Sequence, residues 1–318
     1  MMRILVTGAS GLIGGALVKS LSIAKDISVS GVVRNLDTKL PNNVKPILVT
    51  NINAAQNWVE ILKDVDVIVH CAARVHVMQE IAASPLESYR QANVVGTVNL
   101  AMQAAACGVK RLVFVSTVKV NGEKTLIDSP FFADDSTAPT DSYGISKAEA
   151  ENALREIASN TNLEVVIVRP PLVYGPGVKA NFLALLQALN NRTPLPFAGI
   201  TANRRSLVAL DNLVDCLITC ITHPNAANQT FFVSDGEDMS TAQLLIRMGI
   251  ALGKPARLIF VPLFLLKFVA KLARKTTQAQ RLLGNLQVDI SKTKEHLNWI
   301  PPISVDEGLR RAAESFKR

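Results

Sequence analysis

Three glycines near the amino terminus constrain the fold more than any other feature of the sequence. Gly8, Gly11 and Gly14 are spaced three residues apart, directly after the apolar run Arg3–Thr7 and at the start of a helical pattern over Leu12–Leu21. A tight turn needs residues without a Cβ atom, and the first turn of the helix directs free backbone N–H groups and a favourable dipole at a bound anion. The pattern therefore predicts a strand–turn–helix unit that binds the pyrophosphate of a dinucleotide.

Further apolar runs continue an alternation of strands and helices. They are rich in Val and Ile with little polar alternation, as is typical of strands buried on both faces of a parallel sheet. The predicted strands are Arg3–Thr7, Val29–Val33, Ile47–Val49, Val65–His70, Leu112–Ser116 and Val165–Arg169, and the predicted crossover helices are Leu12–Leu21, Asn93–Cys107 and Ser146–Ala158. We therefore expect an α/β fold, a Rossmann-type doubly wound parallel sheet.

The pattern changes after Tyr174. Pro and Gly cluster over residues 170–177 and again over residues 194–199, and the later strands are short and separated. We expect an NAD(P)-binding Rossmann domain over residues 1–171 and a smaller carboxy-terminal substrate-binding lobe over residues 172–318, with segments that return to the main sheet.

Composition narrows the class of protein. The chain of 318 residues is 48% hydrophobic and 19% charged, which is globular rather than disordered composition. The net charge is +8, yet the basic residues are scattered and no aromatic–basic module is present, so nucleic acid is not an expected partner. The four cysteines show no metal-ligand spacing, which predicts a reduced, cytoplasmic protein without a metal site.

Two segments bear on membranes. The amino-terminal run reaches Gly8 too early to contain the apolar core of a signal peptide. The most apolar stretch, Leu258–Leu266, is interrupted by Pro262 and followed by Lys267 and Lys271, and it is far shorter than the ~20 residues of a membrane span. We expect no stable membrane insertion. An amphipathic helix that covers a cleft is the favoured interpretation, and attachment to a membrane surface is the alternative.

The end of the second strand indicates which dinucleotide is bound. An acidic residue there would accept hydrogen bonds from the adenosine ribose and repel a 2′-phosphate. This sequence has Arg34 after Val33 instead. A guanidinium at this point favours NADP(H), or use of both NADP(H) and NAD(H), although stacking of Arg34 on adenine is an alternative. Asn51, after the third strand, is placed to bond the adenine edge.

A Tyr-x-x-x-Lys pair supplies the chemistry. Tyr143 and Lys147 are four residues apart at the start of a predicted helix, so they share one face. A lysine ammonium beside a phenol is expected to lower the pKa of the tyrosine, which can then exchange a proton with a substrate oxygen while hydride moves to or from nicotinamide. Lys147 can also hold the nicotinamide ribose. Ser116 and Thr117 end the preceding strand, and Thr117 is expected to orient the reacting oxygen.

Together these motifs resemble the extended short-chain dehydrogenase/reductase family, the NAD-dependent epimerase/dehydratase group. Its members include sugar-nucleotide epimerases, dehydratases and 4-ketoreductases. The matching segments run over nearly the whole chain and are Gly8–Gly14, Asp66–Ala73, Asn93–Thr97, Ser116–Thr117, Tyr143–Lys147, Arg169–Pro176 and Leu297–Trp299. The resemblance implies that Thr117, Tyr143 and Lys147 are catalytic and that the substrate is a UDP-sugar.

The resemblance also implies two sets of binding residues. The expected cofactor-binding residues are Gly8, Gly11, Leu12, Ile13, Gly14, Arg34, Asn51, Ile52, Ala72, Ala73, Asn93, Lys147 and Pro170. The expected substrate-binding residues are His76, Thr117, Lys119, Asn181, Arg205 and Arg281, of which the last three are expected to contact the diphosphate. For His76 and Lys119, a structural role in their loops is equally open.

Departures from the family pattern narrow the reaction. Dehydratases follow the catalytic Thr with Asp-Glu, whereas Val118 and Lys119 follow Thr117 here, which argues against 4,6-dehydration. Arg34 suits a reductase that releases NADP(H) rather than an epimerase that retains NAD. Leu172 and Asn285 replace an Asn and an Asp of UDP-hexose epimerases, which argues against strict specificity for UDP-glucose and UDP-galactose. We therefore expect hydride transfer at C4 of a UDP-sugar by a 4-keto-sugar reductase, with a UDP-glucose or UDP-HexNAc 4-epimerase as the alternative.

Two further expectations follow from the resemblance. The segments around residues 73–76, 118–122 and 176–181 are most similar to the branch that acts in polysaccharide synthesis. Many relatives pair through two helices per subunit, so the segments Asn93–Cys107 and Ser146–Ala158 predict a possible homodimer. A non-catalytic NADP-sensing protein is the remote alternative. Such proteins commonly lose the Tyr or the Lys, and this chain keeps both Tyr143 and Lys147.

Overall fold

Seven parallel strands form the central sheet of the computed structural model, which describes residues 1–75, 85–272 and 276–317. Their order across the sheet is β3-β2-β1-β4-β5-β6-β9, and every neighbouring pair is parallel. The strands are β1 (Met2–Thr7), β2 (Ile27–Val33), β3 (Lys45–Leu48), β4 (Val67–His70), β5 (Arg111–Val115), β6 (Glu164–Arg169) and β9 (Thr230–Phe232). The predicted α/β fold class is confirmed.

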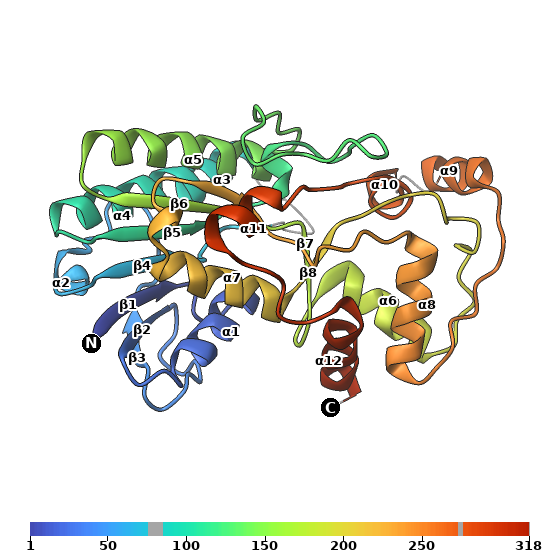
Figure 1. Cartoon of the computed structure of the whole chain (residues 1–318), viewed down its shortest axis with the longest axis horizontal. Coiled ribbons are helices and arrows are strands. Elements are labelled where there is room, and N and C mark those ends of the chain that lie inside the picture. The colour runs from blue at the N-terminus through green and yellow to red at the C-terminus, as the bar shows by residue number, and fades with distance from the viewer. Residues whose placement is uncertain (76–84, 273–275, 318) are drawn as a thin grey trace.

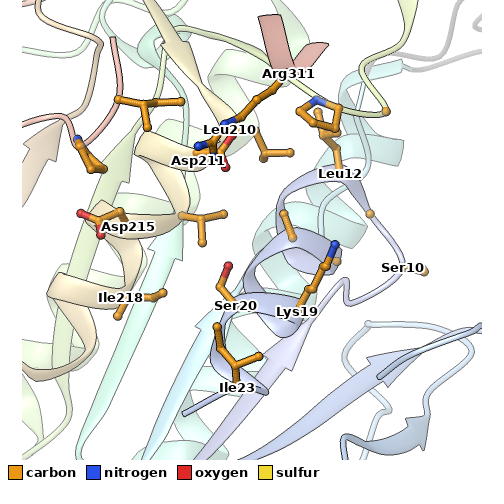
Figure 2. Close-up of a pocket in the computed structure, with 18 of the residues that line it drawn as sticks. Ser10, Leu12, Lys19, Ser20, Ile23, Leu210, Asp211, Asp215, Ile218 and Arg311 are labelled. Carbon is orange, nitrogen blue, oxygen red and sulfur yellow. Dashed lines mark hydrogen bonds and ion pairs between the residues drawn. The ribbon is translucent and has the colours of Figure 1, made fainter. Parts of the chain in front are cut away.

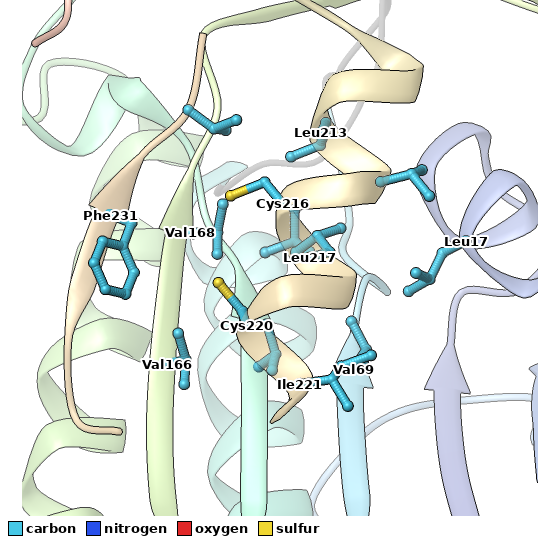
Figure 3. Packing of buried hydrophobic residues seen from close by; sticks show 14 of the residues in the cluster. Leu17, Val69, Val166, Val168, Leu213, Cys216, Leu217, Cys220, Ile221 and Phe231 are labelled. Carbon is cyan, nitrogen blue, oxygen red and sulfur yellow. The ribbon is translucent and has the colours of Figure 1, made fainter. Parts of the chain in front are cut away.

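Helices cover both faces of this sheet (Figure 1). One face packs against α1 (Leu12–Leu21) and α7 (Leu210–Thr222), and Leu213, Cys216 and Leu217 of α7 lie against the sheet (Figure 3). The other face packs against α2 (Val59–Leu62), α4 (Gly96–Ala106) and α5 (Ser142–Asn160), while α3 (Pro85–Arg90), the π-helical turn Gln91–Val95 and the short 3-10 turn Val118–Val120 lead into them. Burial of the strands from both sides explains their continuous apolar sequence.

A second, smaller group of elements has its own apolar core, beside the carboxyl ends of the main strands (Figure 1). A two-stranded parallel sheet connects it to the main body. Its elements are β7 (Leu172–Tyr174), β8 (Leu207–Ala209), α6 (Ala180–Asn190), α8 (Thr241–Leu252), α9 (Leu263–Leu272), α10 (Thr276–Leu283) and α12 (Val305–Lys317), and α11 (Ser291–Leu297) lies against β9. The division of the chain at residue 171 stays a prediction.

The predicted elements match the observed ones closely at the amino-terminal end. Each predicted strand agrees with an observed strand to within two residues at either end, and α1 has the predicted bounds. Two differences have physical causes. Helix α5 starts at Ser142 rather than Ser146, because Asp141 caps it by accepting a hydrogen bond from the Gly144 N–H at 2.7 Å. The predicted helix Asn93–Cys107 begins as the π-helical turn.

The apolar stretch near the carboxyl terminus also differs from its prediction. The helix runs over Leu263–Leu272 rather than Leu258–Leu266, because Pro262 ends the preceding extended segment and permits a helix to start after it. None of its residues is buried. The expectation that this segment covers a cleft is therefore wrong, since a covering helix would bury one face. Over the described residues, no helix is long and apolar enough to cross a membrane.

Strand order places the ligand-binding edge. The sheet runs outward in one direction from β1 and in the other from β4, and these two strands are neighbours. In such sheets ligands bind beyond the carboxyl ends of the strands at this reversal point. The glycine turn follows β1 and residues 71–75 follow β4, so both lie at that point. Gly96 brings α4 close to the same edge, since a Cβ atom there would lie 2.5 Å from the Ile52 carbonyl oxygen.

Candidate active site

The glycine turn has the form that a dinucleotide pyrophosphate requires. A Cβ atom at Gly14 would overlap the carbonyl oxygen of Gly8, which adopts a left-handed φ of 70°, so neither position accepts a side chain. Gly11 begins α1 without a side-chain cap, and the first turn contains no acidic residue. The free N–H groups of Leu12, Ile13 and Gly14 and the helix dipole thus remain available to an anion. The turn fits the predicted cofactor.

Other predicted cofactor contacts lie along the same edge of the sheet. Arg34 is exposed directly after β2, Asn51 and Ile52 follow β3, and the segment that begins with Ala72 and Ala73 follows β4. The Ala72 N–H donates to the Thr7 hydroxyl at 3.2 Å, which draws this segment toward β1. The residues thus form one continuous rim around the glycine turn, although their contacts with a cofactor stay predictions.

Asn93, a predicted cofactor contact, is held by hydrogen bonds within the protein, and its contact with a cofactor stays a prediction. Its side-chain oxygen accepts from the Arg74 N–H at 2.7 Å, and its side-chain nitrogen donates to the Arg74 carbonyl at 3.1 Å and to the Ser146 hydroxyl at 3.0 Å. The amide therefore ties the segment after β4 to α5, the helix that carries Tyr143. Asn93 lies in the π-helical turn, which is a common location for such functional insertions.

Helix α5 presents three functional side chains at four-residue spacing. Tyr143, Lys147 and Glu151 share one face, and Lys147 and Glu151 are fully buried against the sheet. The Lys147 ammonium lies 3.6 Å from the centroid of the Phe114 ring, a cation–π distance. Glu151 forms an ion pair with buried Arg169 at 2.5 Å. The face thus carries the predicted catalytic pair on top of a buried charge network.

Ser116 and Thr117, adjacent at the end of β5, point to different partners. The Ser116 hydroxyl donates to Glu151 at 2.5 Å, so it belongs to the buried network. The Thr117 hydroxyl accepts from the Lys119 N–H at 3.3 Å and caps the short turn Val118–Val120. This turn packs against the start of α5, where a Cβ atom at Gly144 would lie 2.9 Å from the Lys119 carbonyl oxygen. Thr117 thus begins a turn that packs against the start of the helix that carries Tyr143. Its contact with the reacting oxygen stays a prediction.

The electrostatics of the pair differ from the prediction. Burial lowers the pKa of Lys147 to about 7, and the nearby Glu151 carboxylate only partly opposes that shift. The pKa of Tyr143 is raised above its ordinary value by burial and then by the negative charge of Asp141. The expectation that Lys147 lowers the pKa of Tyr143 is therefore wrong for the protein alone. A lysine that loses its own charge near pH 7 exerts little attraction on a phenolate.

His70 plays the structural role that its position suggests. Its two ring nitrogens lie 2.7 Å from the Thr7 hydroxyl and 3.0 Å from the Thr97 hydroxyl, and its ring stacks on Phe114. Burial, followed by the charge of Lys147, lowers the pKa of His70 to about 3. The imidazole is therefore neutral at physiological pH and links β1, β4 and α4 beneath the site.

The predicted substrate residues include a cluster of cations. Lys119 forms ion pairs with Asp141 and, at 2.8 Å, with Glu123, and Arg281 approaches Glu123 at 3.6 Å. Burial, followed by the charge of the neighbouring Arg281, lowers the pKa of Arg205 to about 10. Two arginines held this close favour an anion between them. We call Lys119, Glu123, Arg205 and Arg281 the basic cluster.

Long-range backbone pairing builds this cluster. Arg205 pairs with Met239 on one side and with Leu286 on the other, and its guanidinium donates to the Gly284 carbonyl at 3.2 Å. Three segments far apart in the sequence therefore meet at Arg205. Sequence analysis missed Glu123 and Asp141, although the four-residue spacing of Lys119 and Glu123 and the position of Asp141 before a helix were available signals.

The remaining predicted residues lie at separate places. Asn181 is exposed in the first turn of α6. The Pro170 carbonyl accepts from the Val118 N–H at 3.0 Å, which positions the turn after Thr117. His76 lies outside the described residues. Whether Asn181 and Pro170 contact ligands stays a prediction.

A groove of about 1040 Å³ lies on the other side of the sheet from α5 (Figure 2). The glycine turn, residues 176–179 and residues 302–303 contribute to its lining. The other lining residues come from α1, α7 and α12, among them Lys19, Asp215 and Arg311. Thr117, Tyr143 and Lys147 do not line it. The groove is therefore separate from the reacting groups and meets the candidate site only at the glycine turn.

The lowered pKa of Lys147 predicts an unusual dependence of stability on pH. Between pH 7 and 10.5 the unfolded chain binds a proton that the folded protein lacks, so unfolding becomes less favourable as pH rises through this window. Below pH 7 the buried ammonium lowers the free energy of unfolding by roughly 4–5 kcal/mol, at about 1.4 kcal/mol for each unit of pKa shift.

Replacement of the ammonium should remove this cost. We expect Lys147→Met to unfold at a higher urea concentration than the parent at pH 6 and at a similar concentration at pH 10. Lys45→Met, at an exposed position on β3, is the matched control. Equal effects of Lys147→Met at the two pH values would contradict a buried, strongly shifted amine.

Comparison with known proteins agrees with this geometry. The family model described as the NAD dependent epimerase/dehydratase family matches residues 4–234. A UDP-glucose 4-epimerase of Vibrio cholerae is 50% identical over 313 residues, which cover 98% of this chain and 95% of that protein. A UDP-glucuronic acid 4-epimerase from Bacillus cereus in complex with NAD has a TM-score of 0.80 at 21% identity, over 99% of this chain and 96% of that one.

A second solved structure, MoeE5 in complex with UDP-glucose and NAD, has a TM-score of 0.78 at 23% identity and covers 99% of both chains. At these identities the solved structures show the shared fold. The glycine turn, the Tyr143–Lys147 face and the family match over residues 4–234 lead to one conclusion. The chain belongs to the NAD-dependent epimerase/dehydratase family.

Proposed function

We propose that the protein is an NAD-dependent UDP-sugar 4-epimerase that interconverts UDP-glucose and its C4 epimer. The observation that carries the proposal is the 50% identity to a UDP-glucose 4-epimerase along 98% of the chain. It is combined with Tyr143 and Lys147 on one face of α5 and with Thr117 at the turn that packs against the start of this helix. Sequence analysis alone favoured a 4-keto-sugar reductase because of Arg34. The comparisons support the epimerase better.

The fold and the glycine turn fit the cofactor that the family name implies. The N–H groups at the start of α1 would hold its pyrophosphate, and the rim after β2, β3 and β4 would hold its adenosine half. When bound, NAD supplies a hydride acceptor and donor for C4 of the sugar.

The side chains of this chain handle the proton. Tyr143 takes the proton of the C4 hydroxyl as C4 is oxidised, and it returns that proton when C4 is reduced from the opposite face of the sugar. Thr117, on the turn that packs against the start of α5, bonds the same oxygen and orients it. Lys147 must be charged to favour the phenolate, and an anionic partner above it would oppose the effect of burial on its pKa.

The basic cluster forms the binding site for the diphosphate of the substrate. Arg205 and Arg281 lie close together, and Glu123 is the carboxylate that approaches Arg281 in the protein alone. A diphosphate carries two or more negative charges and would outcompete one carboxylate for the two guanidinium groups. Because these contacts are to the diphosphate and not to C4, the sugar ring is left free to present either face to the cofactor.

The proton role of Tyr143 generates the first test of function. Tyr143→Phe keeps the ring but removes the hydroxyl, so we expect kcat for conversion of UDP-glucose to fall about 10²–10⁴-fold with little change in KM. Tyr89→Phe is the matched control, because the Tyr89 ring packs edge-on against the Tyr143 ring, with 6.2 Å between the ring centroids. It should keep kcat within a few-fold.

Other outcomes would identify other functions. Undiminished conversion by Tyr143→Phe would remove Tyr143 from the mechanism. If the parent converts no UDP-hexose but oxidises NADPH with a UDP-4-keto sugar, the reductase is correct. Absence of turnover on every UDP-sugar would favour the NADP-sensing alternative.

Binding of the diphosphate by Arg205 predicts an effect on KM rather than on kcat. Arg205→Met removes one of the two guanidinium groups that are proposed to bind the diphosphate. We therefore expect KM for UDP-glucose to rise at least tenfold while kcat changes little. Arg204→Met is the matched control, since that neighbouring guanidinium donates to the Thr201 and Asn203 carbonyls. Equal KM values for the two variants would show that Arg205 does not bind the diphosphate.

Two wider expectations also remain proposals. The four cysteines are free thiols, which agrees with a reducing compartment such as the cytoplasm. A homodimer that pairs α4 and α5 of each subunit rests on the family resemblance.

A further inference from the structure

Helix α9 is apolar, yet none of its residues is buried. It spans 10 residues, Leu263–Leu272, and packs mainly against the neighbouring α10 at the far end of the smaller lobe (Figure 1). Large apolar side chains are exposed on the helix and in the segment before it, and these are Ile259, Phe260, Leu263, Phe264, Leu265, Phe268, Val269 and Leu272. Phe264 is 74% exposed and Phe268 is 63% exposed, so neither rests against the protein. A patch of this kind marks an interaction surface.

The charge around α9 indicates the kind of partner. Residues 239–288 contain eight Lys and Arg residues and no Asp or Glu, although the chain has 26 acidic residues elsewhere. Lys267 and Lys271 of α9 are exposed and have no ion pair within the described part of the chain. Carboxylates of other segments pair with Arg247 and approach Arg281, but Lys267 and Lys271 on the exposed apolar helix keep their charge unpaired among the described residues. This combination favours a partner that is both apolar and anionic.

Two other occupants fit this surface less well. A second copy of the chain that paired through the same face would bring the Lys267 and Lys271 side chains of both copies into one interface, and the repulsion of these like charges opposes that pairing. A lid over a UDP-sugar would place leucine and phenylalanine side chains against hydroxyl groups and phosphates, and the exposed aromatic rings would gain little from such a polar ligand.

We propose that α9 docks the protein on the surface of an anionic phospholipid bilayer. The helix is about 15 Å long, which is too short to span a bilayer but long enough to lie along its surface. Phe264 and Phe268 enter the boundary between headgroups and acyl chains, and Lys267 and Lys271 contact the anionic headgroups. This inference does not depend on the proposed enzymatic function.

The test is flotation of the full chain with vesicles of defined composition. We expect the protein to float with vesicles of phosphatidylcholine and 30% phosphatidylglycerol and to remain behind with pure phosphatidylcholine. Binding should weaken as salt is raised, because screening reduces the attraction of the lysines.

Variants assign the binding to α9. Lys267→Glu with Lys271→Glu should lower the partition coefficient at least about 25-fold, since each basic residue near an anionic surface contributes roughly fivefold. Phe264→Ser with Phe268→Ser should abolish flotation. The matched controls are Lys25→Glu with Lys39→Glu, which gives the same net charge at exposed positions, and Leu126→Ser with Ile300→Ser, at apolar positions 78% and 72% exposed. Both controls should still float.

Several results would overturn the proposal. Equal flotation with neutral and anionic vesicles would do so, as would equal losses in the charge variant and its control. If the parent does not float but forms a dimer that Phe264→Ser with Phe268→Ser dissociates, the surface is an interface between copies. Unchanged melting temperatures in all four variants verify that each is folded, as expected for changes at exposed side chains.

Discussion

The buried ion pair between Glu151 and Arg169 is the interaction on which the candidate site depends. It joins α5 to β6, and Ser116 at the end of β5 donates to the same carboxylate. A charge this deeply buried is tolerated only with its partner, so loss of either residue would leave an unpaired charge that costs several kcal/mol. The pair therefore fixes the height and rotation of α5, and with them the positions of Tyr143 and Lys147 above the carboxyl edge of the sheet.

Burial gives the site a chemical state that depends on what it binds. Lys147 lies against Phe114 with a pKa of about 7, and the Tyr143 hydroxyl keeps its proton because burial and Asp141 both oppose the phenolate. An anionic ligand above Lys147 would restore its charge, and that charge would in turn favour ionisation of Tyr143. In the basic cluster Glu123 approaches Arg281, and a bound diphosphate would compete with this carboxylate for the guanidinium group. An anionic ligand would therefore change the electrostatics at both places.

Local sequence signals predicted much of the fold and part of the candidate site. The other features of the site depend on contacts between segments that are far apart in the sequence. The glycine spacing and the apolar runs predicted the strand–turn–helix unit, the strands and the Tyr143–Lys147 face, because each depends on residues close in sequence. Glu151 could not be predicted because its role comes from Arg169, which another segment brings to it. Glu123 has a local signal in its spacing from Lys119, but its contact with Arg281 comes from a distant segment. The predicted direction of the Tyr143 pKa shift was wrong because sequence spacing shows proximity but not burial.

In the proposed reaction, hydride leaves C4 of a UDP-sugar and returns to the same carbon within one site. The most direct measurement uses UDP-glucose deuterated at C4, incubated with the protein without added nucleotide, followed by mass and NMR analysis of the product. We expect a C4 epimer that keeps its deuterium at C4. Formation of the epimer with hydrogen in place of deuterium, or conversion only when NADPH is supplied, would contradict it.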